Sequence, residues 1–278
     1  MQDADIFIFG QGVPKHYPKS PEYKLVAYED ITEPCDIDVI NLSKSYNFSN
    51  IRRLEHAYSE GARIYQLWKN YPIKKYVGTA HYRRYFEFYD NIPNLDDIFA
   101  EHDAIFQLFD IGWPSIRANY EGCHNIDDLN MCVKIIKDWW PEYSDAADYV
   151  MDNKYFVPCN IFLVTREMFC KWCNFVFGVL NDYNEEMGFY TDLDVCNWVV
   201  NHMDKYVWGK GGLPNTSTAY QTRIHAFLME RLSSIFFYKE VKNPYYCDIV
   251  LTETNFDFEK SYFKQFNDEK QDISDNSR

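Results

Sequence analysis

The sequence lacks a long hydrophobic run. Its longest apolar candidate, residues 175–180, lies between Asn174 and Asn181 and falls far short of the roughly 20 apolar residues that cross a bilayer. The first residues carry no basic segment, and the apolar run at 6–9 is too short for a secretory signal. We therefore expect a cytoplasmic protein that meets a membrane at most peripherally, at the inner face of the cell membrane.

Basic charge is also scarce. The 278 residues include 28 Lys and Arg against 42 Asp and Glu, which gives a formal net charge of -14. Nucleic-acid binding typically needs a basic stripe, and binding to anionic lipid through charge needs a polybasic patch. Neither pattern occurs along the chain, so we expect no nucleic-acid partner.

Two familiar site motifs are missing as well. The eight cysteines include one CxxC, Cys170 and Cys173, and no second pair completes a zinc site. Without a secretory signal we expect free thiols, and the spacing of these two suits one buried helix face. Gly10-Gln11-Gly12 lacks the Lys and Ser/Thr of a P-loop, which disfavours a phosphotransferase.

Aromatic residues, in contrast, are abundant. They make up 18% of the chain, and 23 of them are Tyr. Tyr offers a stacking face and a hydroxyl, which suits sugars and nucleobases. An AT-rich genome, which enriches Tyr and Phe by itself, explains the same composition equally well.

Predicted strands and helices alternate along the chain. The strands are expected at 6–9, 25–28, 37–40, 76–80, 104–109 and 161–164, and the helices at 51–70, 96–102, 128–140, 166–182, 192–206 and 218–238, with a loop at 210–215. This pattern predicts an α/β fold with a central sheet flanked by helices. No linker divides the chain, so we expect one domain over residues 1–255 and an acidic flexible tail over 256–278.

A cationic cluster follows the predicted strand at 76–80. His81-Tyr82-Arg83-Arg84 comes directly after it, and ligands of α/β sheets bind at the carboxyl ends of strands. Arg presents a planar donor fork that suits phosphate oxygens, and Tyr can stack on a base or sugar. A structural ion-pair cluster, for example Arg84 with Glu60 or Glu87, explains the same residues, and spacing alone does not decide between the two.

Five blocks in this order resemble a bacterial family first catalogued as a domain of unknown function, which includes polysaccharide-biosynthesis glycosyltransferases and galactofuranosyltransferases. The blocks extend from about Tyr46 to Val241. They are Ser59-Glu60 with Leu67-Trp68-Lys69-Asn70; the hexapeptide at 81–86; Tyr120, His124, Asp127, Asp128 and Leu129 with Pro141-Glu142-Tyr143; Asn160-Ile161-Phe162 with Phe169, Trp172 and Leu180; and Tyr220-Gln221, Arg223, Phe227-Leu228 and Glu230-Arg231-Leu232.

The resemblance implies a GT-A-like nucleotide-sugar-binding fold with a mixed central sheet. It also implies a transferase that moves a hexose, such as galactose or galactofuranose, from a UDP-sugar donor to a glycan or lipid-linked glycan acceptor of the O-antigen or capsule type. The chain departs from the family pattern at its first strand, where relatives carry a His-Lys pair and this sequence has Gly10-Gln11. That departure motivates the alternative of a catalytically inactive nucleotide-sugar or glycan-binding module. The segment 189–215 looks like an insertion relative to typical members of this family.

The donor site is expected to include His81, Arg83 and Arg84 on the leaving diphosphate, because negative charge grows there during transfer. Tyr82 would stack on the ligand. Glu60 would hold the arginines in place. Asn160 would form hydrogen bonds with sugar hydroxyls through its amide, or it would act as a turn residue. Arg223 would either reach the site or form a structural ion pair with Glu230.

An acceptor hydroxyl also needs a base within hydrogen-bond reach. His124, Asp127 and Asp128 are the candidates because they cluster before a helix. Helix N-capping explains Asp127 equally well, and a satisfied loop histidine explains His124.

We predict no metal site and no cofactor, so the arginines take the role that a metal ion has in many transferases. The alternative is a divalent Mn²⁺ or Mg²⁺ ion. The sequence contains one Asp-x-Asp, Asp192-Leu193-Asp194, but it lies within a helical pattern and reads as a solvated helix start.

Overall fold

The computed structural model describes residues 2–10, 12–45, 48–206 and 217–252. Its main sheet has the strand order β10-β6-β9-β4-β1-β2-β3, with β5 paired to β4 and β11 paired to β5. The strands are β1 (Ala4–Phe9), β2 (Tyr23–Ala27), β3 (Asp38–Asn41), β4 (Tyr76–His81), β5 (Arg84–Phe86), β6 (Ala104–Phe106), β9 (Phe162–Thr165), β10 (Pro244–Tyr246) and β11 (Ile249–Leu251), and a separate pair is formed by β7 (Phe109–Asp110) and β8 (Tyr155–Phe156).

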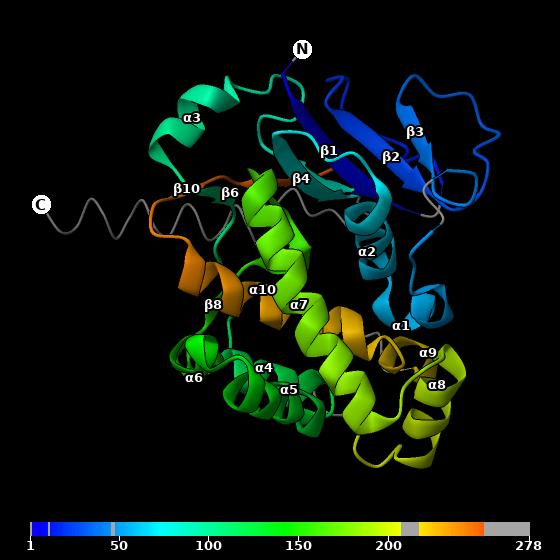
Figure 1. The fold of residues 1–278 in the computed structure, drawn as a ribbon, viewed down its shortest axis with the longest axis vertical. Coiled ribbons are helices and arrows are strands. Elements are labelled where there is room, and N and C mark those ends of the chain that lie inside the picture. The colour runs from blue at the N-terminus through cyan, green and yellow to red at the C-terminus, as the bar shows by residue number, and fades with distance from the viewer. Residues whose placement is uncertain (1, 11, 46–47, 207–216, 253–278) are drawn as a thin grey trace, which may run out of the picture.

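Most of the helices gather at one end of the molecule, beyond one face of the sheet, whereas α3 packs against the other face (Figure 1). They are η1 (Arg52–Leu54), α1 (Glu55–Tyr58), α2 (Glu60–Asn70), α3 (Leu95–Glu101), α4 (Ile116–Cys123), α5 (Ile126–Trp139), η2 (Pro141–Tyr143), α6 (Ser144–Asp152), η3 (Pro158–Asn160), α7 (Arg166–Met187), α8 (Asp192–Asn201), α9 (Thr218–Gln221) and α10 (Ile224–Glu240). Within the described ranges, no helix combines the length and the apolar composition that a bilayer crossing requires.

Side-chain alternation along the strands builds two cores. In β1, Phe7 and Phe9 face the large helical core, whereas Ile6 and Ile8 face the smaller core on the opposite side. In β4, Gly78 allows a close approach, because a Cβ there would lie 3.0 Å from the side chain of Ile6. The central strands are therefore buried on both faces.

The sheet is mixed, as predicted. Strands β1, β2, β3 and β4 run parallel to one another, whereas β9 is antiparallel to β4 and β6. The carboxyl ends of β1, β2 and β4 therefore meet at one edge, close to the start of the helices. The α/β fold with a central mixed sheet flanked by helices is confirmed.

Two long helices, α7 and α10, pack against each other. Helix α7 begins as predicted after Thr165, whose side chain accepts a hydrogen bond from the Met168 amide, and it ends at Gly188 in the left-handed conformation (φ 69°). Helix α10 is buried along most of its length and contacts α7 and α6. Because α10 has little solvent-facing surface, it acts as the centre of the helical end of the molecule.

Two predicted helices are each broken into pieces. The helix predicted over 51–70 is interrupted at Ser59, whose φ is 53°, and the one predicted over 218–238 is interrupted between α9 and α10 at Thr222 and Arg223. The first break lies two residues before Gly61, the weak position of that predicted helix, and the second has no Gly or Pro beside it. Other boundaries shift by a few residues; for example, the helix predicted over 192–206 ends at Asn201 and the strand predicted over 104–109 is split into β6 and β7.

Some predictions lie outside the described residues. These are the loop at 210–215 and the acidic tail at 256–278. All eight cysteines are described and all are free thiols, with Cys173 buried and Cys170 half-buried on α7, as predicted.

Candidate functional site

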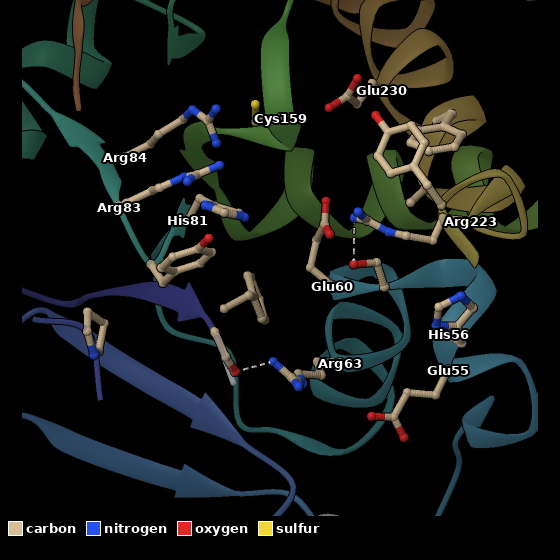
Figure 2. Close-up of a pocket in the computed structure, with 18 of the residues that line it drawn as sticks. Glu55, His56, Glu60, Arg63, His81, Arg83, Arg84, Cys159, Arg223 and Glu230 are labelled. Atoms are coloured by element: carbon tan, nitrogen blue, oxygen red, sulfur yellow. Dashed lines mark hydrogen bonds between the residues drawn. The ribbon is translucent and has the colours of Figure 1, made fainter. Parts of the chain in front are cut away.

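A large cleft opens at the sheet edge where β1 and β4 end. Its volume is about 1420 Å³, and its walls come from the residues after β1, from α1 and α2, from the turn between β4 and β5, and from α4, α9 and α10. Figure 2 shows how side chains from these segments face one another across it. The position agrees with the rule that ligands of open α/β sheets bind beyond the carboxyl ends of strands.

The cleft is basic although the chain as a whole is acidic. Seven of the lining residues are Lys or Arg and four are Asp or Glu, against a net charge of -14 for the whole chain. The basic residues are Lys15, Arg52, Arg63, Arg83, Arg84, Arg223 and Arg231, and the acidic ones are Glu55, Glu60, Asp192 and Glu230. A local reversal of charge in a cleft concentrates anions there.

Four of these guanidinium groups, those of Arg63, Arg83, Arg84 and Arg223, have no carboxylate partner. None of the ion pairs among the described residues involves them. Arg63 instead donates to the Gly10 carbonyl at 2.6 Å. The Nε atoms of Arg63 and Arg83 are buried without any hydrogen-bond partner in the described part of the chain. The alternative that these arginines form a structural salt-bridge cluster with Glu60 or Glu87 is therefore wrong.

A tight hairpin presents the cationic motif. His81 pairs with Arg84 across β4 and β5, so Tyr82 and Arg83 form the turn. The Tyr82 amide donates to the Phe9 carbonyl at 3.1 Å, which fixes the hairpin to the end of β1. Glycine at position 10 permits this approach, because a Cβ there would lie 2.9 Å from the Cβ of Tyr82.

His81 is held in its neutral form. Burial, followed by the positive charges of Arg84, Arg83 and Arg223, lowers its pKa to about 3. Its ring lies 4.3 Å from that of Tyr82. At neutral pH, His81 therefore contributes a hydrogen-bonding imidazole and no charge.

The two helix breaks meet inside the cleft. Arg223, at the start of α10, donates from its guanidinium to the Ser59 hydroxyl at 3.0 Å, and Ser59 precedes α2 (Figure 2). Both residues line the cleft. The breaks thus bring a guanidinium and the first residue of α2, Glu60, to the same space.

Glu60 lies in the cleft but does not hold the arginines as predicted. Its carboxyl oxygen accepts from the Asn160 side-chain amide at 3.2 Å. Asn160 itself is buried and does not line the cleft, so it supports Glu60 and has no exposed surface for reading a sugar.

His124 lines the cleft as a buried, neutral ring. Its Nδ1 is 3.1 Å from the Gln221 amide oxygen, and its ring stacks on Phe227 at 3.9 Å. Burial, followed by the charge of Arg231, lowers its pKa to about 3. Such a low pKa makes His124 a weak proton acceptor.

Asp127 and Asp128 do not reach the cleft. Asp127 is exposed and pairs with Lys205 at 2.9 Å, and the N-cap of α5 is Asn125 instead. Asp128 points into the helical core, where it accepts hydrogen bonds from the hydroxyls of Tyr183 and Tyr206, and burial raises its pKa to about 7. Neither carboxyl can touch a ligand in the cleft, so we do not assign either as the base.

Two further lining residues were placed wrongly or missed by sequence reasoning. Glu230 pairs with Arg231 at 2.9 Å and not with Arg223, and burial raises the pKa of its carboxyl. Arg63 was missed, although it lies three residues after Glu60 and therefore on the same face of α2.

The side chains that could ligate a metal ion are not clustered in the described part of the chain. In the described ranges, no three His, Cys, Asp or Glu side chains lie together in a way that could hold a metal ion. Of the Asp-x-Asp pair, Asp192 accepts from the backbone amides of His56 and Ala57, and Asp194 forms a capping box with Thr191. Both aspartates are thus engaged in capping helices.

Comparisons place this molecule among known sequences. The model of the family described as "Domain of unknown function (DUF4422)" matches residues 42–203, which is more than half of the chain. The match includes Glu60, the hairpin motif and Asn160, and ends before Tyr220. None of the curated proteins matches this sequence.

Among solved structures, the apo structure of the WbbM bifunctional glycosyltransferase is similar over 92% of this chain and 48% of that chain, with a TM-score of 0.65 and 16% identity. This chain thus spans about half the length of that protein, and the likeness establishes a shared fold. The structure of the mannosyltransferase Ktr4p from S. cerevisiae covers 68% of this chain and 62% of that chain, with a TM-score of 0.32 and 12% identity, and it supports no structural inference.

Proposed function

This chain belongs to the DUF4422 family, and we propose that it is a glycosyltransferase that takes a sugar from a nucleotide-sugar donor and adds it to a glycan acceptor. The observation that carries the proposal is the set of four arginines without carboxylate partners in one cleft of an acidic protein. The four side chains are half-buried, and guanidinium groups without carboxylate partners repel one another there, so such a set is expected where an anion binds.

A nucleoside diphosphate suits this cluster. Arg83 and Arg84 enter from the hairpin and Arg223 from the opposite wall, so a diphosphate between them would meet donors from two sides (Figure 2). When the anomeric C–O bond breaks, negative charge grows on the leaving phosphate, and fixed cations stabilise that charge without rearranging. Neutral His81 would add a hydrogen bond. Tyr82 would offer a stacking face to the sugar or base.

The finer identity of the substrates is also a proposal. The family resemblance favours a UDP-linked hexose, galactose or galactofuranose, as donor, and a surface polysaccharide of the O-antigen or capsule type, free or lipid-linked, as acceptor. We expect the reaction to take place in the cytoplasm, at the inner face of the membrane. The arginines take the role that a divalent metal ion has in other transferases, and no step is assigned to a metal.

Nucleotide-sugar binding tests the proposal directly. We expect UDP and at least one of UDP-glucose, UDP-galactose and UDP-galactofuranose to raise the melting temperature of the protein, because a ligand of the native state stabilises it by mass action. Slow release of UDP from the same donors should follow, and it should persist with excess EDTA. A melting temperature that no nucleotide sugar changes would reject the proposal, and activity that EDTA abolishes and Mn²⁺ restores would reject its metal-independent form.

The inactive binding module is the second candidate. It is favoured by Gly10-Gln11, which stands where relatives carry a His-Lys pair at the end of the first strand. Binding of UDP-sugars without release of UDP, in the presence of a broad set of glycan acceptors, would support the module over the enzyme.

A further inference from the structure

The geometry points to Glu60 as the catalytic base of this site, the group that takes the proton from the attacking acceptor hydroxyl. The inference rests on the proposed function and adds to it the residue that activates the acceptor. It replaces the three candidates around the start of α5: Asp127 and Asp128 lie outside the cleft, and His124 is a weak proton acceptor.

Glu60 occupies the middle of the cleft. It is the first residue of α2, and Figure 2 shows its carboxyl between the hairpin that carries His81 and Arg83 on one side and Arg223 on the other. A diphosphate bound by the arginines of both walls would therefore place its sugar near this carboxyl. The acceptor hydroxyl must approach that sugar, so its proton would be within reach of Glu60.

The other acidic side chains of the cleft are already engaged. Glu230 is paired with Arg231, and the amide of Cys159 also stabilises its charge. Asp192 accepts two backbone amides at the start of α1. Glu55 lies 3.8 Å from Arg52. Glu60 differs because its hydrogen-bond partner is the neutral amide of Asn160, and its Oε2 accepts from no described residue.

A buried polar chain orients Glu60. The Trp172 indole N–H donates to the Ser233 hydroxyl at 3.0 Å, Ser233 donates to the Asn160 Oδ1 at 2.8 Å, and Asn160 donates to the Glu60 Oε1 at 3.2 Å. Trp172, Ser233 and Asn160 are each at most 1% exposed, so the chain is held by the core. Because its donors are uncharged, this chain positions the carboxylate without neutralising it, which preserves its ability to accept a proton.

Backbone strain collects around the same carboxyl. In the described part of the chain, the non-glycine residues with positive φ are Ser59 (53°), Cys159 (56°) and Asn160 (51°). Ser59 immediately precedes Glu60, and Asn160 donates to it. Such conformations are sparsely populated and persist mainly where they serve a site.

The chemical step then balances as follows. The acceptor oxygen forms a bond to the anomeric carbon while its proton passes to Glu60, and the bond from that carbon to the phosphate oxygen breaks. The electron pair of the broken bond leaves with UDP, whose new charge is met by Arg83, Arg84 and Arg223. The sugar is transferred with inversion, and the proton on Glu60 is later released to solvent.

Glu60→Gln tests this role with little structural change, because glutamine can still accept from Asn160. The assay is UDP release from an equimolar mixture of UDP-glucose, UDP-galactose and UDP-galactofuranose with water as acceptor. We expect the rate to fall by about 10²–10⁴-fold, the usual contribution of a general base, while UDP still raises the melting temperature as in the wild type. Glu121→Gln, on the exposed side of α4, is the matched control and should leave the rate unchanged.

Asn160→Asp tests the supporting chain. A second carboxyl beside Glu60 raises the pKa of both, so the acidic limb of the pH–rate profile should move to higher pH, an effect that a merely structural role would not produce. Aspartate tolerates the left-handed backbone at this position.

The outcomes separate the two proposals. The assignment of Glu60 is overturned, while the transferase stands, if Glu60→Gln binds UDP and still releases UDP from the UDP-sugars at a rate within about threefold of the wild type. It is also overturned if Glu230→Gln alone abolishes this UDP release. If the wild type neither binds UDP nor releases it, the proposed function itself fails.

Discussion

The two ends of β1 treat buried charge in opposite ways. At its start, Asp5 is fully buried and is surrounded by compensating groups: Lys74 at 2.9 Å, Lys24 at 3.8 Å and the Tyr71 hydroxyl at 3.2 Å. At its end, the cleft holds four guanidinium groups with no carboxylate partner among the described residues.

The contrast separates stability from function. At the start of β1, one carboxyl is matched by nearby cations, as is expected where charge serves only the fold. At the end of β1, cations are gathered and left unmatched, which weakens the folded state unless an anion binds. Variants at the two ends should therefore affect different properties of the protein.

The cleft end should show the largest effect, and it should be on activity. Replacing Arg83 and Arg84 together by alanine removes two preorganised cations, and we expect UDP release from UDP-sugars to fall by at least about 10²–10³-fold. The free energy of unfolding should change by less than about 1 kcal/mol, since no ion pair is broken. Lys134→Ala, which removes an exposed pair with Asp138, is the control for both measurements. Full activity in the double variant would remove the basis of the contrast.

The opposite end should affect stability. Asp5→Ala leaves Lys74 and Lys24 beside an apolar core without their carboxylate, and urea unfolding should show a loss of about 3 kcal/mol. Asp38→Ala removes an exposed carboxylate from the same Lys24 and should cost less than about 1 kcal/mol. Equal losses in the two variants would contradict the interpretation.

A buried neutral histidine, His225, should make the free energy of unfolding depend on pH. Burial lowers the pKa of His225 from 6.5 to about 3, so between these values the unfolded chain binds a proton that the folded protein does not. Stability from this residue is therefore complete above about pH 6.5 and is lost as pH falls. We expect the wild type to lose about 1–2 kcal/mol more than His225→Asn between pH 7 and pH 5, by urea unfolding at each pH. Parallel pH dependence in the two proteins would show that His225 is not the cause.

The smallest effect on activity is expected at the start of α5. Asp127→Asn and Asp128→Asn should keep UDP release within about threefold of the wild type, because neither carboxyl reaches the cleft. Burial raises the pKa of Asp128 from 3.8 to about 7, so its stabilising contribution is complete below about pH 3.8 and is lost as the pH rises to about 7. Asp128→Asn should therefore lack this loss between pH 5 and pH 7. A large drop in UDP release would return Asp128 to the list of catalytic candidates.

The sequence predicts the central strands of the sheet because their signals are local, whereas the short strands β5, β10 and β11 were not predicted. The apolar runs of β1, β4 and β9 and the Thr165 cap of α7 all lie where residue patterns place them, and so does the cationic motif at the end of β4. Charge type and strand position were enough to place His81, Arg83 and Arg84 at this cleft, and their role in donor binding stays a prediction.

The breaks in the helices could not be predicted, because tertiary contacts impose them. Ser59 carries no turn signal, and its positive φ is compatible with its hydroxyl accepting from Arg223, which is distant in sequence. Asp127 and Asp128 share a helix N-terminus, but only the packing of α5 decides that one faces solvent and the other the core. The position of Glu230 in the cleft could not be predicted for a similar reason. Helix α10 is buried almost all round, so its sequence shows no polar face that would indicate which side lines the cleft.

The hairpin of the cleft depends on a strand made much later in the chain. Strand β11 pairs with β5, with Leu251 opposite Arg84, and the Thr252 amide donates to the Arg83 carbonyl at 3.0 Å. On the ribosome, the arginine turn is synthesised early but lacks this neighbour until residue 252 has emerged. A nascent chain therefore holds its arginine turn against one strand only until β11 has been made.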